Sequence, residues 1–145
     1  TQFQRRDAYN SISMPVYHTA AYEFDNADDM ADAFCGRTDA PDYSRVMNPT
    51  VTFFENKVKE LTGAAEVIAL NSGMAAISNT LFSIAAAGKN IVTSRHLFGN
   101  TYSFIAGTLS RFGVEPRLCD LTDIGAVEKV VDSNTCCIYV EIITT

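Results

Sequence analysis

Short apolar runs alternate with helix-like segments along most of this chain, and this alternation limits its possible folds more than any other feature. Four apolar runs have the length and residue types of buried strands, at residues 67–70, 91–94, 114–120 and 135–141. Segments with helical periodicity lie between them, at residues 74–86, 101–112 and 122–131. This order predicts an α/β fold with a mostly parallel sheet and helices on both of its faces.

The first third of the chain has a different character. Residues 1–24 show no sustained periodicity and indicate an extended arm, and residues 36–50 form a loop rich in Gly, Pro, Asp and Asn. Between them, Asp25 or Asn26 can cap a short helix that ends at Phe34.

A longer helix is expected from an N-cap at Thr50 to Gly63. We therefore divide the chain into an arm with its loop, residues 1–49, and the first part of an α/β domain, residues 50–145. Because the chain stops at Thr145, directly after a strand, we expect it to be the N-terminal portion of a longer protein.

Composition excludes several classes of protein. The chain has 145 residues, 47% of them apolar and 19% charged, which fits a folded domain with its own core. The net charge of −6 and the scattered positions of the 11 basic residues argue against a nucleic-acid surface. No apolar run approaches the roughly 20 residues of a membrane span, and no signal peptide is visible at the start.

Cysteine and histidine spacing gives no sign of a metal site. The two histidines are far apart in sequence, and the cysteines contain no C-x-x-C pair. We expect the cysteines to be reduced packing residues in a cytoplasmic protein. They are Cys35, Cys119, Cys136 and Cys137.

The segment "NSGM" follows the first predicted strand, at the edge of a parallel sheet where ligands bind. Gly73 allows close approach of a ligand, and the amides of Gly73, Met74 and Ala75 would be free donors at a helix N-terminus. Together with the Ser72 hydroxyl they could bind a phosphate. The alternative is an ordinary turn in which Ser72 is only the N-cap.

Two other strand ends carry candidate residues. Phe98 could stack on an aromatic ligand or be a core residue, and Tyr102 falls four residues later on the same side of a helix. Glu141, at the end of the last strand, is either a site residue or an anchor for the start of a helix.

Tyr43 and Arg45 stand two residues apart in the loop of residues 36–50. In an extended backbone the two side chains share a face, where a phenol and a guanidinium could bind one anion. The alternative is a solvated loop with an ordinary surface arginine.

These residues in this order resemble the pyridoxal-phosphate enzymes of Cys/Met metabolism, and most of all the O-acetylhomoserine sulfhydrylase branch. The motifs that carry the resemblance cover nearly the whole chain. They are "PVYHTAAYEF", "YSRVMNPT", "ALNSGMAAI", "HLFGNTYSF" and "FGVEPRLCD".

The resemblance implies the cofactor, pyridoxal 5′-phosphate, and roles for individual residues. Gly73, Met74 and Ser72 would bind its phosphate, and Phe98 would stack on its pyridine ring. Tyr43 and Arg45 would reach the phosphate in a neighbouring subunit of a homotetramer built from dimers that share active sites. Tyr102 and Glu141 would line the pocket. The fold implied is the large domain of fold-type I pyridoxal-phosphate enzymes.

Two departures from the family pattern are visible. The family often has Tyr at the position of Phe98, so an acid–base role of that hydroxyl is lost here. Thr145 stands where the family pattern has Asn.

The family's Schiff-base lysine lies in a Ser-x-Thr-Lys-like setting, which none of the four lysines here has. They are Lys57, Lys59, Lys89 and Lys129. We therefore expect no catalytic residue in this chain, which should be inactive alone.

The resemblance implies that the full enzyme replaces the acetate of O-acetyl-L-homoserine by sulfide or a thiol, giving homocysteine or methionine. Methionine γ-lyase and cystathionine γ-synthase activity are alternatives within the family. An alternative of another class is a non-catalytic, anion-binding α/β fragment.

Overall fold

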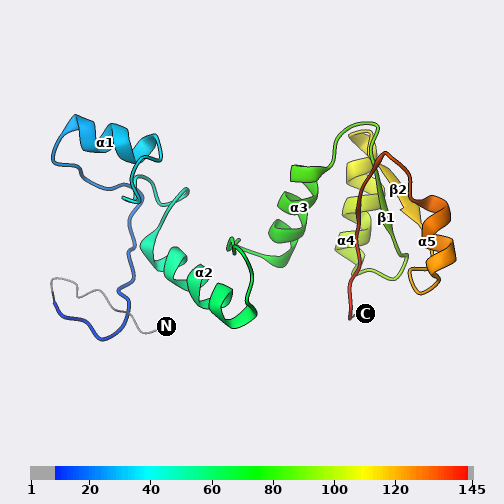
Figure 1. The fold of residues 1–145 in the computed structure, drawn as a ribbon, viewed down its shortest axis with the longest axis horizontal. Coiled ribbons are helices and arrows are strands. Elements are labelled where there is room, and N and C mark those ends of the chain that lie inside the picture. Colours follow the sequence, from blue (N-terminus) through cyan, green and yellow to red (C-terminus); the bar gives the residue numbers. More distant parts are fainter. Residues whose placement is uncertain (1–8, 144–145) are drawn as a thin grey trace. The chain divides into compact units, whose positions relative to one another are not determined.

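The computed structural model describes residues 9–143 (Figure 1). It contains two compact units, one ending at Ala69 and the other beginning at Leu70. The functional boundary expected after residue 49 stays a prediction. Thr145, the position at which the family pattern has Asn, lies outside the described residues.

The first unit contains helices α1 (Ala27–Phe34) and α2 (Pro49–Thr62). Of the two residues that the sequence offers as the cap of α1, Asp25 and Asn26, the structure uses Asn26, which accepts the Asp29 N–H at 2.8 Å. Gly63, with φ of 69°, ends α2 in the left-handed conformation that also fits the prediction.

The predicted N-cap of α2 is wrong by two residues. Asn48 is the cap, because its side chain accepts the Thr50 N–H at 2.9 Å. Pro49 then occupies the first helical position, where its fixed φ suits the helix and its missing N–H costs no hydrogen bond.

The predicted strand at residues 67–70 is absent. Within residues 9–143 these residues pair with no strand, and Ile68 is 79% exposed. The Ala69 N–H instead donates to the carboxylate of Glu55 at 2.8 Å. Because a strand is stabilised by its ladder with a neighbour, an apolar sequence alone does not form one.

The second unit is built on a sheet of three parallel strands in the order β2-β1-β3. They are β1 (Asn90–Thr93), β2 (Glu115–Leu118) and β3 (Thr135–Ile138). The parallel arrangement confirms the sequence prediction. Pro116 lies in β2 at an edge of the described sheet, where its missing N–H is tolerated.

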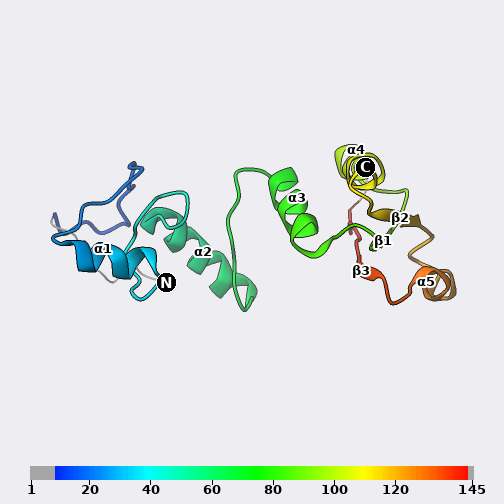
Figure 2. The same cartoon turned by 90° about the horizontal axis from the view of Figure 1, so that it is seen from above.

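Helices cover both faces of this sheet. They are α3 (Gly73–Ile84), α4 (Gly99–Ser103) with its π-helical continuation η1 (Phe104–Leu109), and α5 (Ile124–Val130). Figure 2 shows α4 and α5 on opposite sides of the sheet, which agrees with the predicted layers. All four residues of β1 are buried as a result.

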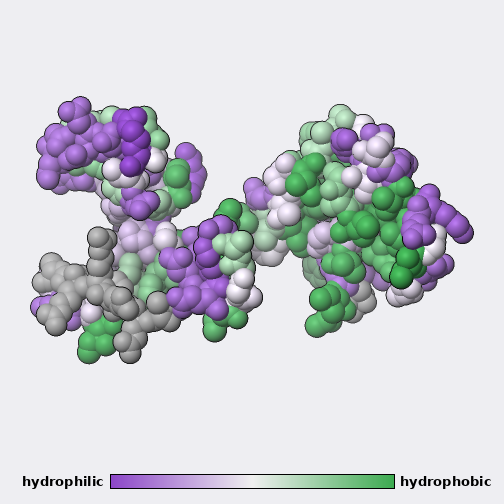
Figure 3. Space-filling view, in the orientation of Figure 1, coloured by the Kyte–Doolittle hydropathy of each residue, from purple (hydrophilic) through white to green (hydrophobic). Residues whose placement is uncertain are grey.

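One apolar core joins α3, η1 and the sheet. Leu81, Ile91, Ile105, Leu109 and Val114 are almost completely buried in it. Other large apolar side chains of this unit remain exposed, as the hydropathy-coloured surface shows (Figure 3). Phe82 and Phe112 are examples, with 51% and 62% exposure.

All four cysteines are free thiols. Cys119, Cys136 and Cys137 are partly buried, whereas Cys35 is exposed, so the prediction of a packing role is wrong for Cys35. It follows the last residue of α1, where the chain leaves the helix towards solvent. Burial, and then the neighbouring Cys136, raise the pKa of Cys137 to about 11.

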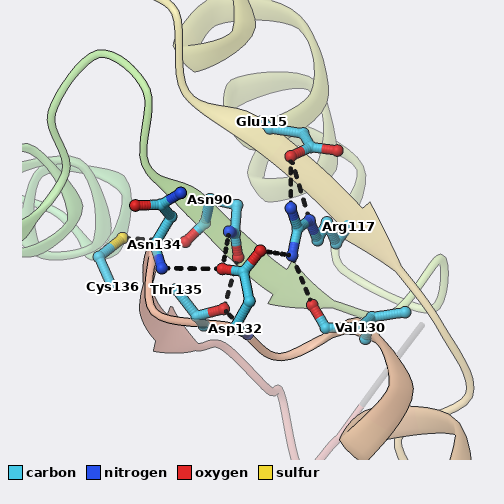
Figure 4. Close-up of polar contacts among 8 residues, drawn as sticks. All are labelled: Asn90, Glu115, Arg117, Val130, Asp132, Asn134, Thr135 and Cys136. Atoms are coloured by element: carbon cyan, nitrogen blue, oxygen red, sulfur yellow. Dashed lines mark hydrogen bonds and ion pairs between the residues drawn. The ribbon is translucent and has the colours of Figure 1, made fainter.

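The amino ends of the strands are joined by a polar network, which Figure 4 shows. Asn90 donates to Asp132 at 3.0 Å and accepts from the Thr135 hydroxyl at 2.7 Å. Arg117 donates to Asp132 at 2.7 Å and to Glu115 at 3.0 Å. This edge of the sheet is therefore closed by internal contacts.

No helix among residues 9–143 is long and apolar enough to cross a membrane.

Candidate functional site

The carboxyl ends of the strands form the opposite edge of the sheet, where the predicted site residues of the second unit begin. Hydrogen bonds hold together the segments that leave this edge. The Thr93 hydroxyl donates to the Tyr139 carbonyl at 2.8 Å, and the Cys119 N–H donates to the Thr93 carbonyl at 3.0 Å.

The N-terminus of α3 presents two free backbone donors. The Ser72 hydroxyl accepts the Ala75 N–H and the Ser72 carbonyl accepts the Ala76 N–H, both at 3.0 Å. Among the described residues, the amides of Gly73 and Met74 have no acceptor. The prediction of a third free donor at Ala75 is wrong, because the Ser72 cap uses it.

The surroundings of Gly73 are open. Gly73 is exposed, and a Cβ built on it would meet no atom within 4 Å. A free pair of amides at the positive end of a helix favours an anion. Ser72 acts as the N-cap, and its hydroxyl hydrogen remains available to an anion as well.

Phe98 lies just before α4 with a ring that is open to solvent. Its residue is 48% exposed, so it is not the core residue that the sequence allowed as an alternative. Its N–H donates to Oε2 of Glu141 at 2.7 Å, and its carbonyl accepts the Tyr102 N–H at 3.0 Å. The backbone of Phe98 is thus held on both sides, while about half of the residue is open to solvent.

Glu141 contacts both the sheet and α4. Its Oε1 accepts from the Tyr139 hydroxyl at 3.2 Å, in addition to the bond from Phe98. The Phe98 amide is the main cause of a lowered pKa of Glu141. Burial opposes this effect, and the Thr101 and Tyr139 hydroxyls make smaller contributions that lower the pKa further. Burial first, and then Glu141, raise the pKa of Tyr139. The structure thus shows the anchoring contact that was one of the two sequence alternatives.

Two neighbouring side chains of α4 face the interior. Tyr102 is half-buried and packs against the apolar core, so its predicted place in a pocket stays a prediction. Thr101 is fully buried, and its hydroxyl lies 3.9 Å from the sulfur of Met74. This contact brings the N-terminus of α3 close to the start of α4. The sequence gives no signal for Thr101, which is one of many helical threonines.

Tyr43 and Arg45 meet in the first unit, but not through an extended backbone. Residues 43–46 form a turn closed by the Val46 N–H and the Tyr43 carbonyl at 2.8 Å. The Arg45 guanidinium carbon lies 5.2 Å from the centre of the Tyr43 ring, within cation–π range. Both residues are exposed. They border a cavity of about 450 Å³ lined by His18, Thr19, Ala20, Tyr43, Ser44 and Arg45.

These features fit the cofactor that the sequence resemblance implies. Two free amides at α3 suit a phosphate, and the exposed Phe98 ring suits a flat heteroaromatic ring. The hydroxyl contact between Thr101 and Met74 links the elements that carry them. That each of these residues binds the cofactor stays a prediction.

Comparisons with known proteins also indicate a pyridoxal-phosphate enzyme family. The family model described as "Cys/Met metabolism PLP-dependent enzyme" matches residues 1–145. An L-methionine gamma-lyase of Fusobacterium nucleatum subsp. polymorphum is 34% identical over 94% of this chain and 34% of its own length.

Two solved structures are also similar. A Campylobacter jejuni structure, named as an O-acetylhomoserine (thiol)-lyase with a pyridoxyl-lysine phosphate, has a TM-score of 0.85 and 37% identity over 92% of this chain and 33% of its own. The O-acetylhomoserine sulfhydrylase of Wolinella succinogenes has a TM-score of 0.65 and 46% identity over 67% of this chain and 28% of its own. The chain thus spans about a third of the length of the proteins it matches.

Proposed function

We propose a function from one established premise: the chain belongs to the Cys/Met metabolism PLP-dependent enzyme family. The family's cofactor is pyridoxal phosphate, and the fold is that of fold-type I pyridoxal-phosphate enzymes. The proposal concerns the activity, the substrates and the assembly.

We propose that the whole protein is an O-acetylhomoserine sulfhydrylase and that this chain is its N-terminal part. It replaces the acetate of O-acetyl-L-homoserine by sulfide or a thiol, giving homocysteine or methionine. The observation that carries this choice is the 46% identity with the Wolinella succinogenes sulfhydrylase. The 37% identity with the Campylobacter jejuni structure supports it. We further propose a cytoplasmic homotetramer made of dimers that share active sites.

The residues of this chain would bind and orient the cofactor. The Gly73 and Met74 amides and the Ser72 hydroxyl would hold its phosphate, and Phe98 would cover one face of its ring. Tyr43 and Arg45 would add a phenol and a guanidinium to the phosphate of the neighbouring subunit. Bound there, pyridoxal phosphate would supply the electron sink for the reaction.

We assign no catalytic residue within this chain. Phe98 has no hydroxyl with which to move a substrate proton. Lys59 is paired with Glu66 at 2.7 Å, and the Lys57 ammonium lies 5.6 Å from the centre of the Phe53 ring. None of the four lysines has the family's Ser-x-Thr-Lys-like setting. We therefore propose that the reactive lysine lies in another part of the protein and that this chain alone is inactive.

Methionine γ-lyase is the second candidate, because enzymes of that name from several bacteria are 32–35% identical to this chain. Cystathionine γ-synthase is a further alternative in the same family. A non-catalytic, anion-binding fragment is the alternative outside enzyme function.

Three measurements on the intact protein separate the sulfhydrylase, the lyase and the non-catalytic fragment. Protein incubated with pyridoxal phosphate and then desalted should keep a visible absorbance band, and a colourless protein would contradict the cofactor assignment. Acetate release from O-acetyl-L-homoserine that depends on sulfide would support the sulfhydrylase. Ammonia release from methionine without acetate release would favour the lyase.

A further inference from the structure

We propose that Glu141 is a positioning residue, which fixes the backbone before α4 so that the Phe98 ring is held against the cofactor ring. The inference rests on the proposed function, because it assumes that Phe98 faces the cofactor. It assigns to Glu141 a role through Phe98 and not a contact with the substrate.

The start of α4 depends on this distant carboxylate. Phe98 is the N-cap residue of α4, and no side chain of the helix itself caps it. The Phe98 N–H instead donates at 2.7 Å to a residue that lies 43 positions later in the chain. Because Phe98 is 48% exposed, packing fixes its position only in part, and the hydrogen bond to its backbone adds to that restraint.

The carboxylate is itself fixed to the sheet. Tyr139 donates its hydroxyl to Oε1 of Glu141 at 3.2 Å. The Tyr139 backbone is bound on both sides to β1, with its N–H on the Val92 carbonyl at 2.9 Å and its carbonyl on the Thr93 hydroxyl at 2.8 Å. Glu141 therefore links the backbone of Phe98 to the carboxyl end of the sheet through hydrogen bonds.

The same network reaches the phosphate end of the site. Thr101 of α4 is fully buried, and its hydroxyl lies 3.9 Å from the sulfur of Met74 near the N-terminus of α3. Through α4, the segment that presents the Phe98 ring is thus linked to the helix N-terminus that presents free amides. A ligand with a phosphate and a ring needs both in a fixed relation.

The test compares Glu141→Ala with Glu141→Gln in the intact protein. Glutamine keeps an oxygen acceptor for the Phe98 N–H, and its amide can donate to the Tyr139 oxygen, so it should rescue the geometry. Glu128→Ala is the matched control, because Glu128 is an exposed glutamate on α5. The probe is pyridoxine 5′-phosphate, which has the ring and the phosphate but no aldehyde.

Glu141→Ala should bind the probe about tenfold more weakly, a change of about 1.4 kcal/mol, since one charge-assisted hydrogen bond is lost. The induced circular dichroism of the bound ring should decrease, and amide exchange in residues 95–101 should accelerate. Glu141→Gln and Glu128→Ala should behave like the unaltered protein. Affinity for inorganic phosphate should be unchanged, because the amides of Gly73 and Met74 remain.

Several results would overturn the inference. These are an unchanged probe affinity and dichroism in Glu141→Ala, a Glu141→Gln variant as impaired as Glu141→Ala, or equal loss of phosphate and probe binding. If Glu141→Ala fails to fold, the exchange and dichroism of Glu141→Gln still decide, because loss of both contradicts a geometric role. If the unaltered protein binds neither the probe nor pyridoxal phosphate, the proposed function itself fails. In that case, amide exchange of residues 95–101 without ligand still shows whether Glu141 fixes the backbone of Phe98.

Discussion

At the scale of single residues, Gly113 occupies a position that other residues would strain. Its φ is 79°, and its carbonyl accepts the Gly88 N–H at 2.8 Å. A Cβ built on Gly113 would lie 3.2 Å from the Cβ of Ala87, closer than ordinary contact.

We predict that Gly113→Ala lowers the free energy of unfolding by about 1–2 kcal/mol, the cost of a left-handed conformation for a residue with a Cβ. Gly107→Ala is the control, because Gly107 lies in η1 and a Cβ there meets no atom within 4 Å. That variant should gain up to about 1 kcal/mol. Urea unfolding of both variants measures the difference, and an equal effect of the two would contradict the prediction.

Residue-level prediction from the sequence succeeded at several local interactions, although the N-cap of α2 was placed at Thr50 and the structure has it at Asn48. The cap at Asn26, the left-handed Gly63 and the cap at Ser72 all involve neighbours within four positions. The bond between Glu141 and Phe98 joins residues 43 positions apart, so only the folded chain reveals it. For the same reason, the sequence could name Glu141 as important without choosing between its two roles.

At the scale of elements, the sequence predicts helices and parallel strands well because their apolar periodicity is strong. The π-helical turn of η1 was not predicted, since Ile105 and Leu109 also have ordinary helical spacing. The prediction of a strand at residues 67–70 was wrong for another reason. Its apolar residues are suited to a strand, but pairing depends on a neighbour that the described residues do not provide.

The polar network at the amino ends of the strands makes stability depend on pH. Hydrogen bonds from Arg117, then Asn90 and then the Asn134 amide lower the pKa of Asp132 from 3.8 to about 2. The folded state therefore binds this proton less readily than the unfolded state does. The stabilisation is complete above about pH 4 and is lost as the pH falls towards 2.

Asp132→Asn should therefore reduce the change in unfolding free energy between pH 4 and pH 2. It should also lower stability at neutral pH, because Arg117 loses one of its two charged partners and keeps only Glu115. Thermal unfolding at a series of pH values measures both effects. Glu128→Gln should keep the original pH dependence, and an unchanged profile in Asp132→Asn would show that the network does not titrate as described.

At the scale of the whole molecule, the shared active site that we propose for the dimer can be tested by mixing variants. If Arg45 serves the phosphate of the neighbouring subunit, Arg45→Ala and Gly73→Asp remove contributions of different chains to one site. Each variant alone should retain little pyridoxal phosphate.

Subunits of the two variants, dissociated and reassembled together, should recover cofactor retention, because some sites then combine an intact Arg45 with an intact Gly73. Arg37→Ala, which removes an exposed arginine paired with Asp32, should retain the cofactor without mixing. No recovery after mixing would place Arg45 in the site of its own chain or outside any site.

The sheet also has a consequence for the order in which the chain folds. Strand β1 pairs with β2, which follows it closely, and with β3, whose Thr135 lies 45 residues after Asn90. Closing a longer loop costs more conformational entropy, and contacts distant in sequence form more slowly. We therefore expect β1 and β2 to pair first with η1 packed on them, while β3 joins last. Because Glu141 follows β3, the Phe98 backbone becomes ordered only in this final step of folding.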